Sequence, residues 1–353
     1  MFFRAADRED ARHWQAFVES SASADFLHDW GWGEVAAFDG QPHRRYVMED
    51  AGRILAAAAV QERSLMRGRS FWYAAHGPIL DYTDPRAGHV LSAFVNWLRI
   101  AAREQGAIAI KLEPRLDADE PAAALFDQLP DVVRLPDTLQ VGQTRIVSIG
   151  SDDELLDGFD KDTRYSIRRA VREGVEVWVF DDPGDLRPID DLHALVEETQ
   201  RRAGFPMPPL KRYRIAWHAL AKAGRASVLE ARRDGELLAS GMLVIEGDRS
   251  FYLFSGSRRE APGEPKRYAS YALQWGMLQL ARQRGVRQHD LWGIAPPDAG
   301  PDHPWHGVGL FKKGFGGREV TWAGSWDVVV DPAMYRLRET TAAVRGWLRG
   351  LRR

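Results

Sequence analysis

Residues 235–239, Gly-Glu-Leu-Leu-Ala, begin the stretch that decides the fold, because a similar pattern, Gly-Arg-Ile-Leu-Ala, stands at residues 52–56. Each pattern leads to an aromatic run, Phe-Trp-Tyr at 71–73 and Phe-Tyr-Leu-Phe at 251–254. A stretch with helical patterning follows each run and ends in Ala-Arg-x-x-Gly. Two similar blocks in one chain indicate an internal duplication, although a shared order of elements can also arise without one.

The elements expected in each block have the same order. A β-hairpin precedes a long helix that ends at Gly106 or Gly285, and a further strand follows at 107–112 or 288–292. The order β-β-β-α-β resembles the acyltransferase fold of the GNAT class. The sequence therefore predicts an α/β (α+β) protein made of two tandem GNAT-like domains, with mixed sheets flanked by helices.

The composition describes an ordinary globular chain. A length of 353 residues favours two domains, and 44% hydrophobic with 28% charged residues is typical of proteins that fold in water. The longest apolar run, near 54–60, is far shorter than the ~20 residues that span a membrane. The absence of cysteine excludes a thiolate nucleophile, and the net charge of −2 argues against a generally basic nucleic-acid surface. Because no signal peptide is visible, a cytoplasmic location is expected.

Further elements are expected between and after the two blocks. Residues 153–174 read as helical and place Arg164, Arg168 and Arg172 on one stripe. This stripe suits either tRNA phosphates or a solvated face paired with neighbouring acids. The remaining expected elements are helices at 188–202 and 211–223, a strand at 320–330 and a closing helix at 335–351.

Lysine is rare in this chain, and two lysines stand side by side. Only seven of the 48 basic residues are lysines, and Lys312 and Lys313 lie within Leu-Phe-Lys-Lys-Gly-Phe-Gly-Gly at 310–317. An ammonium is a compact charge on a flexible stem, whereas the guanidinium of arginine is a wide planar fork. The pair therefore indicates either a site that needs an ammonium or, in the plainer interpretation, a solvated loop.

Four segments, in this order, resemble the Fem family of aminoacyl-tRNA-dependent transferases that build peptidoglycan interpeptide bridges. They are 26–33 (Phe-Leu-His-Asp-Trp-Gly-Trp-Gly) with 76–78 (His-Gly-Pro), 161–175, 198–205 (Glu-Thr-Gln-Arg-Arg-Ala-Gly-Phe), and 290–294 (Asp-Leu-Trp-Gly-Ile) with 309–316. The resemblance spans essentially the whole chain. It implies a first domain of residues 1–150 plus about 325–353 and a second domain of residues 151–324. No long heptad stretch is present, so the compact form without a long helical arm is expected.

The resemblance implies a reaction and its partners. An amino acid would move from the ester of an aminoacyl-tRNA to a side-chain amine of a UDP-linked or lipid-linked muramyl pentapeptide. The protein is expected to be a monomer that needs no metal and no cofactor. The ester is already activated and the amine attacks it, so no protein nucleophile is required. The enzyme must instead supply alignment and a charge for the tetrahedral oxyanion.

Three residues are expected to act in the chemistry. By resemblance, Lys312 is the oxyanion cation and Lys313 contacts substrate or tRNA phosphate, although these two roles could be exchanged. Glu113 and Asp290 end equivalent strands of the two blocks and are alternatives for a general base. Proton loss to water or to the tRNA ribose would also suffice. The glycines within 314–317 would let the backbone approach the substrate closely.

Other residues are expected to bind the substrates. Arg202 would hold a phosphate or carboxylate of the precursor, unless it only complements a helix dipole. The basic, apolar tail at 345–353 suits either peripheral contact with the inner face of an anionic membrane or an ordinary closing helix. The aromatic residues expected to contact substrate are Trp30, Tyr73, Tyr252, Tyr268 and Phe311.

Two other functions fit the same fold. An acyl-CoA N-acyltransferase would need a glycine-patterned pyrophosphate loop before a helix, and neither 81–88 nor 263–268 has that pattern. A non-catalytic protein that binds tRNA or precursor would not need the intact segment 311–316. Aminoacyl transfer to a peptidoglycan precursor is therefore the prediction.

Overall fold

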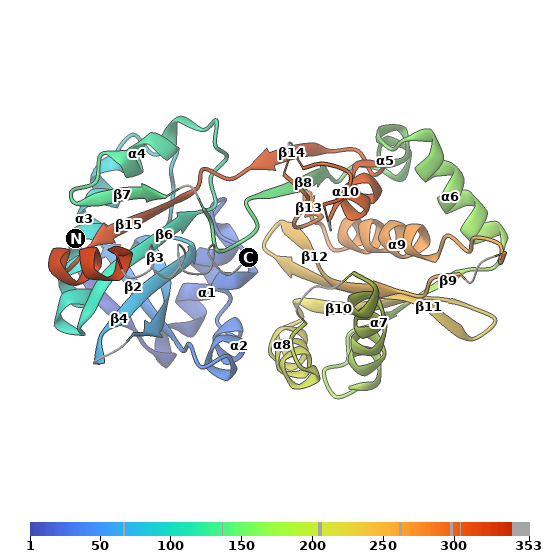
Figure 1. Cartoon of the computed structure of the whole chain (residues 1–353), viewed down its shortest axis with the longest axis horizontal. Helices are drawn as coiled ribbons and strands as arrows, with labels where there is room; N and C mark the ends of the chain where they lie inside the picture. The colour runs from blue at the N-terminus through green and yellow to red at the C-terminus, as the bar shows by residue number, and fades with distance from the viewer. Residues whose placement is uncertain are drawn as a thin grey trace. The chain divides into compact units, whose positions relative to one another are not determined.

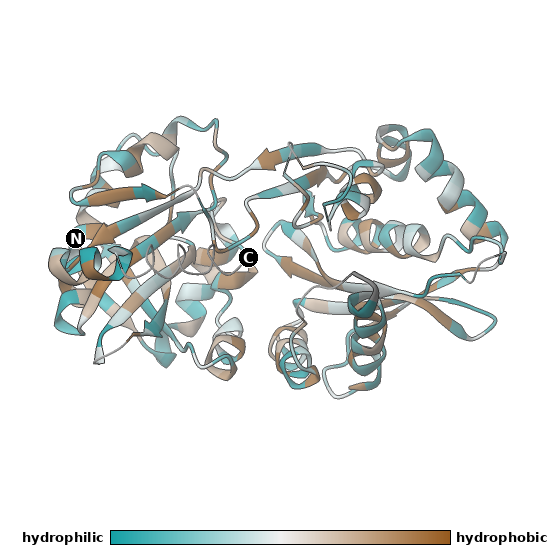
Figure 2. Ribbon diagram, in the orientation of Figure 1, coloured by the Kyte–Doolittle hydropathy of each residue, from teal (hydrophilic) through white to brown (hydrophobic). Residues whose placement is uncertain are grey.

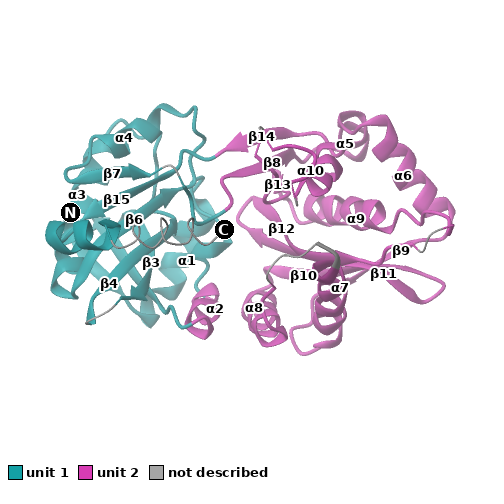
Figure 3. Cartoon of the chain, viewed as in Figure 1, with its two compact units in different colours: residues 1–30, 40–140, 322–353 teal, residues 31–39, 141–321 magenta. Residues whose placement is uncertain are grey.

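The computed structural model describes residues 1–65, 68–135, 137–203, 207–260, 263–296, 299–303 and 305–340. It forms two compact units (Figure 3). Unit 1 consists of residues 1–30 and 40–140 and the described residues from 322 onward, and unit 2 consists of residues 31–39 and 141–321. The expected domain boundaries differ at 31–39 and 141–150, which belong to unit 2.

Local contacts explain both differences. The helix α2 (Trp32–Phe38) packs on α8 (Leu210–Lys222), where Arg212 pairs with Asp39 at 2.8 Å. The strand β8 (Gln143–Ser148) pairs with β13 (Gln288–Asp290) and β14 (Arg318–Thr321), both strands of unit 2.

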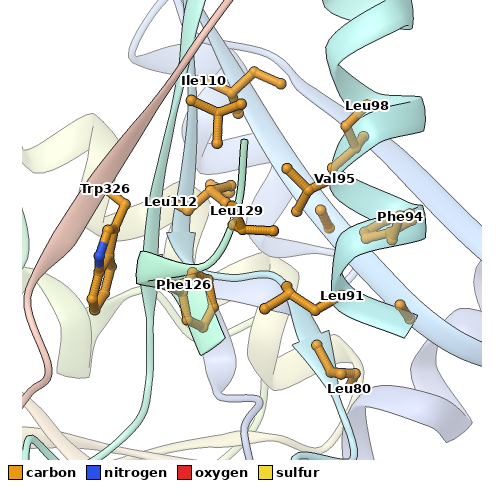
Figure 4. Packing of buried hydrophobic residues seen from close by; sticks show 14 of the residues in the cluster. Leu80, Leu91, Phe94, Val95, Leu98, Ile110, Leu112, Phe126, Leu129 and Trp326 are labelled. Carbon is orange, nitrogen blue, oxygen red and sulfur yellow. The ribbon is translucent and has the colours of Figure 1, made fainter. Parts of the chain in front are cut away.

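Alternating side chains give the sheet of unit 1 two buried faces. In β3 (Arg53–Ser64), Ala56 and Ala58 belong to the larger core cluster, whereas Ala57 and Ala59 belong to a second cluster. This is the period of two that a strand buried on both faces requires. The helix α3 (Ala87–Glu104) packs in the first cluster and α1 (Ala11–Ser20) in the second. Figure 4 shows the first cluster with Leu91, Phe94, Val95 and Leu98 of α3, and with Ile110, Leu112, Phe126, Leu129 and Trp326.

One parallel pair of strands marks the centre of the unit 1 sheet. The strands β4 (Ser70–His76) and β6 (Ala107–Pro114) are parallel, and α3 connects them. The strand order is β1-β2-β3-β4-β6-β15-β7, and β5 pairs with β3. The other elements of unit 1 are β1 (Phe2–Ala6), β2 (His43–Asp50), β5 (Ile79–Leu80), α4 (Ala124–Asp127), β7 (Val132–Leu135) and β15 (Ser325–Val329).

Unit 2 repeats this arrangement. The strands β12 (Arg249–Ser257) and β13 are parallel neighbours joined through α9 (Ala269–Gln283), in the order β14-β8-β13-β12-β11-β10-β9. Figure 1 shows α7 and α8 on one face of this sheet and α9 on the other. The predicted β-β-β-α-β order is confirmed in both units. The other elements of unit 2 are α5 (Asp152–Gly158), α6 (Lys161–Arg172), β9 (Glu176–Phe180), α7 (Arg187–Ala203), β10 (Ala226–Arg233), β11 (Glu236–Glu246) and α10 (His306–Lys313).

Two predicted elements are each divided in the structure. The helix expected at 153–174 is two helices, because Phe159 takes an extended backbone and buries its ring between them. Figure 2 shows the second of these, α6, as largely hydrophilic. The strand expected at 320–330 is also two strands, β14 in the sheet of unit 2 and β15 in the sheet of unit 1. A sequence pattern cannot reveal this, because both halves have the same local character.

A helix begins at residue 332, where the closing helix was expected from 335, and residues from 341 onward lie outside the described part of the chain. The tail at 345–353, with its expected membrane contact, falls there too. Within the described ranges, no helix combines the length and the apolar character that crossing a membrane requires.

Candidate active site

The side chain of Lys312 is buried in unit 2 and held by backbone oxygens. It lies in the last turn of α10 and is only 6% exposed. Its Nζ donates to the carbonyl of Trp292 at 3.2 Å and to that of Gly293 at 2.7 Å. An ammonium has three N–H donors, so these two bonds leave one donor for another acceptor. Lys313, by contrast, is exposed.

The backbone after β13 is shaped to present these two carbonyls. Trp292 has a left-handed conformation (φ 62°), and its N–H donates to Oδ1 of Asp290 at 2.8 Å. The hydroxyl of Thr144 donates to the same oxygen. Gly293 has no room for a side chain, because a Cβ there would lie 2.7 Å from Val141. Asp290 therefore fixes the turn that holds Lys312.

Burial controls the charge of Lys312. Loss of solvation lowers the pKa of Lys312 to about 8, and the nearby Asp290 carboxylate opposes this shift. The ammonium is therefore the main form at neutral pH. The neighbouring His289 does not compete, because burial and the Lys312 charge lower the pKa of His289 to about 3. Its neutral ring is bonded to Ser250 and Gln274.

One aromatic ring lies near this ammonium, and a row of rings leads from the neighbouring Phe311 to a cavity. The Nζ of Lys312 lies 5.9 Å from the ring centre of Tyr252, which is half-buried. Phe311 packs on Tyr271 with ring centres 5.1 Å apart, and Tyr271 contacts Tyr268 at 6.3 Å. Tyr268 and Tyr271 line a cavity of about 780 Å³ in unit 2. Three of the expected substrate-binding aromatics thus lie near Lys312 or this cavity.

The glycines after Lys313 serve packing within unit 2. A Cβ on Gly316 would lie 2.3 Å from the carbonyl oxygen of Gly158, and one on Gly317 would lie 2.3 Å from that of Ile146. Both glycines have positive φ, 69° and 72°. A Cβ on Gly314 would lie 2.2 Å from Oγ1 of Thr163. These contacts explain the three glycines by packing within unit 2, and their expected close approach to substrate stays a prediction.

Replacing Gly317 by alanine should destabilise the protein by about 2–4 kcal/mol, through left-handed strain and a backbone clash. Thermal and urea unfolding would measure the loss. The matched control is Gly307→Ala in α10, where nothing lies within 4 Å of the added Cβ. That change should be neutral or slightly stabilising, since alanine favours helix over glycine. Equal stability of the two variants would contradict the packing role.

Glu113 is fully engaged within unit 1. Its carboxylate is buried and accepts from the Tyr73 hydroxyl at 2.9 Å. It also accepts from the backbone N–H of Leu139 at 3.0 Å and of Gln140 at 2.8 Å. Tyr73 is completely buried, and burial, with the Glu113 charge, raises the pKa of Tyr73. Tyr73, which was expected to contact substrate, thus lies in the interior of unit 1, and Glu113 anchors the chain at 139–140.

Trp30 is half-buried in unit 1 and stacks under a guanidinium. The Arg45 guanidinium lies 4.1 Å from its ring centre, and Arg45 also donates to the Trp30 carbonyl at 2.7 Å. Burial lowers the pKa of Arg45 to about 10, although Asp29 opposes the shift. Arg45 therefore keeps its positive charge at neutral pH.

The arginine stripe of α6 is not uniform. Arg164 donates to the carbonyls of Leu156 and Phe159 and so completes the end of α5. Arg168 and Arg172 are exposed. Arg202 lies in the last turn of α7, and its side chain falls outside the described residues. The stripe therefore offers two exposed cations, and Arg164 has a structural partner instead.

The segment at 26–33 adjoins a buried charge cluster in unit 1. Asp25 precedes it, is fully buried, and is bonded to Nδ1 of His76. It lies 3.3 Å from Nδ1 of His28 and 3.9 Å from Nε of Arg115. Its Oδ1 also accepts from the N–H of Leu27 at 3.0 Å. The segments at 26–33 and 76–78 are thus joined by one carboxylate.

Solved structures show which fold this chain has. A tandem GNAT protein from the clavulanic acid biosynthesis pathway is 16% identical, and it superposes with a TM-score of 0.55 over 94% of this chain and 99% of its own. The crystal structure of FemX superposes with a TM-score of 0.85 at 20% identity, over 96% of this chain and 99% of its own. The fold is therefore that of the tandem GNAT-like proteins.

The FemAB family model matches residues 10–123 and 221–342, and the chain belongs to the FemAB family. The UDP-N-acetylmuramoylpentapeptide-lysine N(6)-alanyltransferase of Weissella viridescens is 24% identical over 343 residues, which are 93% of this chain and 96% of that protein. The lipid II:glycine glycyltransferase of Staphylococcus aureus strain MRSA252 is 22% identical over 401 residues, with 92% of each covered. The family expected from sequence is thus confirmed.

Proposed function

We propose that this protein transfers an amino acid from an aminoacyl-tRNA to the side-chain amine of a muramyl pentapeptide, UDP-linked or lipid-linked, and so forms an interpeptide bridge. One observation carries the proposal, the buried ammonium of Lys312 with a single N–H donor left over. The two relatives support the acceptor, because their names specify a muramoylpentapeptide lysine and lipid II. The intact segment 311–316, which contains Lys312, favours an enzyme over a non-catalytic binding protein.

The reaction needs a cation while the tetrahedral intermediate carries a negative charge on oxygen. The neutral amine attacks the carbonyl carbon of the ester, the C–N bond forms, and the carbonyl electrons move onto oxygen. Lys312 donates its remaining N–H to this oxyanion. Collapse breaks the bond from carbon to the ribose oxygen, which receives the proton that the amine loses, directly or through water. The products are an amide and an uncharged tRNA.

The two strand-end carboxylates act as positioning groups in this proposal. Asp290 holds the left-handed turn at Trp292, so it aims two carbonyls at Lys312. Glu113 accepts three hydrogen bonds and holds the chain at 139–140. A base that already accepts several hydrogen bonds is poorly suited to take another proton. We therefore assign proton removal to water or to the ribose.

Direct assay of transfer tests the function. The purified protein would be incubated with charged tRNAs and with either a UDP-linked or a lipid-linked pentapeptide, and the products weighed by mass spectrometry. Addition of an amino-acid residue to the stem peptide is the expected result. Acetyl transfer from acetyl-CoA, without addition from any charged tRNA, would show that the protein is an ordinary N-acyltransferase.

The kcat of transfer should fall as the pH rises through about 8, because the Lys312 ammonium then loses its proton. The contribution of Lys312 is full below that pH and lost above it. The amine nucleophile has the opposite dependence, because its neutral fraction grows with pH. A pH series of kcat would therefore show a descending limb in the wild type. Lys312→Arg should lack this limb, because guanidinium stays charged.

A further inference from the structure

The strand β8 lies between the two chain segments that hold Lys312. Its neighbours in the sheet are β13, which leads into the turn at Trp292 and Gly293, and β14, which follows the turn after α10 (Figure 1). Both neighbours are antiparallel to β8, and all of these elements belong to unit 2. Because one strand borders both segments, its residues can fix the two segments relative to each other.

The first segment, 291–294, is bonded to the backbone of β8 at both of its ends. It contains the two carbonyls that accept from Nζ of Lys312. The N–H groups of its first and last residues donate to carbonyls of β8, at Arg145 (2.8 Å) and at Gln143 (3.1 Å). The backbone of β8 therefore sets where the two carbonyls lie.

The second segment is the turn at 314–317, and the side chain of Arg145 holds it. The Nη1 of Arg145 donates to the carbonyl of Gly316 at 3.0 Å and to that of Gly317 at 3.1 Å. Its Nη2 donates to the carboxylate of Glu319 in β14. A guanidinium presents five N–H donors in a rigid planar fork, so one side chain can serve all three acceptors.

The turn that Arg145 holds is continuous with the last turn of α10. The N–H of Phe315 donates to the carbonyl of Lys312 at 3.1 Å, and the N–H of Gly316 donates to that of Lys313 at 2.9 Å. The backbone of Lys312 is therefore tied to the carbonyls that the guanidinium holds. A shift of this turn would move the ammonium away from its place beside the first segment.

Burial of Arg145 calls for an explanation other than stability. The residue is only 6% exposed, whereas the side chain of its partner Glu319 is 53% exposed. Burying a guanidinium costs free energy, and an apolar side chain of similar size is often as stabilising or more so. We infer that Arg145 is a positioning residue, which fixes the turn after α10 relative to the carbonyls at 292–293 and so places the Lys312 ammonium for transfer, an inference that rests on the proposed function.

Replacement of Arg145 by methionine should lower kcat for aminoacyl transfer by about 10–100-fold, because a small displacement of a catalytic group has effects of this size. The KM for the precursor should change little, since Arg145 acts through Lys312. Arg145→Lys should give an intermediate kcat, because a single ammonium cannot reproduce the fork that serves three acceptors. If Arg145→Met does not fold, Arg145→Lys decides, and a wild-type kcat in that variant would overturn the positioning role.

Arg232→Met is the matched control for stability. Arg232 also lies in a strand of unit 2, and it donates to the carboxylate of Glu230 at 2.7 Å and to the carbonyl of Gly235 at 3.0 Å. Its replacement should lower the unfolding temperature by at least as much as Arg145→Met but keep kcat within a few-fold of wild type. Equal losses of kcat in the two variants would show that Arg145 acts only through stability, which would overturn the positioning role.

The titration of Lys312 gives a second measurement that does not depend on transfer. The chain has only seven lysines, so isotope-labelled lysine would resolve the signal of Lys312, which Lys312→Met would identify by its absence. In the wild type the pKa of Lys312 should be about 8. In Arg145→Met this pKa should rise toward the ordinary value of 10.5, because a displaced ammonium regains contact with water.

The two measurements separate the positioning role from the proposed function. If the wild type transfers an amino acid and Arg145→Met keeps its kcat, the positioning role fails while the proposed function stands. A lower kcat with an unchanged Lys312 titration would show that Arg145 acts elsewhere, and would overturn the role too. If no charged tRNA supports transfer by the wild type, the proposed function fails. The titration then decides alone, since a raised pKa in Arg145→Met supports the role and an unchanged pKa overturns it.

Discussion

Replacement of Lys312 by methionine should lower kcat for aminoacyl transfer by roughly 10²–10³-fold, which corresponds to about 3–4 kcal/mol of lost oxyanion stabilisation. Methionine keeps most of the length and apolar volume of lysine but has no N–H donor. The carbonyls of Trp292 and Gly293 lose their shared donor in the variant. The KM for the precursor should change little, because the lost interaction belongs to the transition state.

Three measurements make this prediction decisive. Lys313→Met is the matched control, since Lys313 is exposed on the same turn and should keep kcat within a few-fold of wild type. Lys312→Arg should lose part of its activity but keep more than Lys312→Met, because the guanidinium keeps the charge but fits poorly between two carbonyls. Thermal unfolding separates catalysis from stability. A larger loss in Lys313→Met than in Lys312→Met would show that the two roles are exchanged.

The fold was predictable because its signals are local and occur twice. The patterns at 52–56 and 235–239 mark hairpins, and glycine ends each long helix. The division between β14 and β15 was not predictable, since pairing partners decide it. β14 pairs with β8 in one sheet, whereas β15 pairs with β6 and β7 in the other.

The sequence indicated candidate residues for the site but not the partners that the structure gives them. Lys312 stood out as a rare lysine, yet its burial depends on carbonyls nineteen and twenty residues away. Asp290 and Glu113 stood out as strand-end carboxylates. Apart from the N–H of Trp292, which lies two residues after Asp290, their donors come from another strand and from the chain at 139–144, which no local pattern connects with them.

The largest expected change in stability comes from replacing Asp25, which lies beside the segments of unit 1 that carry the family resemblance. Asp25→Ala should destabilise the protein by about 3–5 kcal/mol, because it leaves buried partners without their carboxylate. Those partners are His76, His28 and Arg115, all nearly inaccessible to water. Urea unfolding at neutral pH would measure the loss.

Asp7→Ala is the matched control for Asp25→Ala, because both carboxylates accept from an N–H two residues on at the start of a 3-10 helix. Asp7 is exposed, so its loss should cost only about 0.5–1 kcal/mol.

Burial alone would raise the pKa of Asp25, but the charges of His76 and His28 outweigh burial and hold that pKa well below its usual value. Since the folded pKa is depressed, the stability from Asp25 is complete above the unfolded pKa of about 4 and is lost as the pH falls below it. The stability difference between wild type and Asp25→Asn should therefore shrink as the pH falls from about 5 into stronger acid, and a difference that stays the same over that range would show that the carboxylate is not held as an anion.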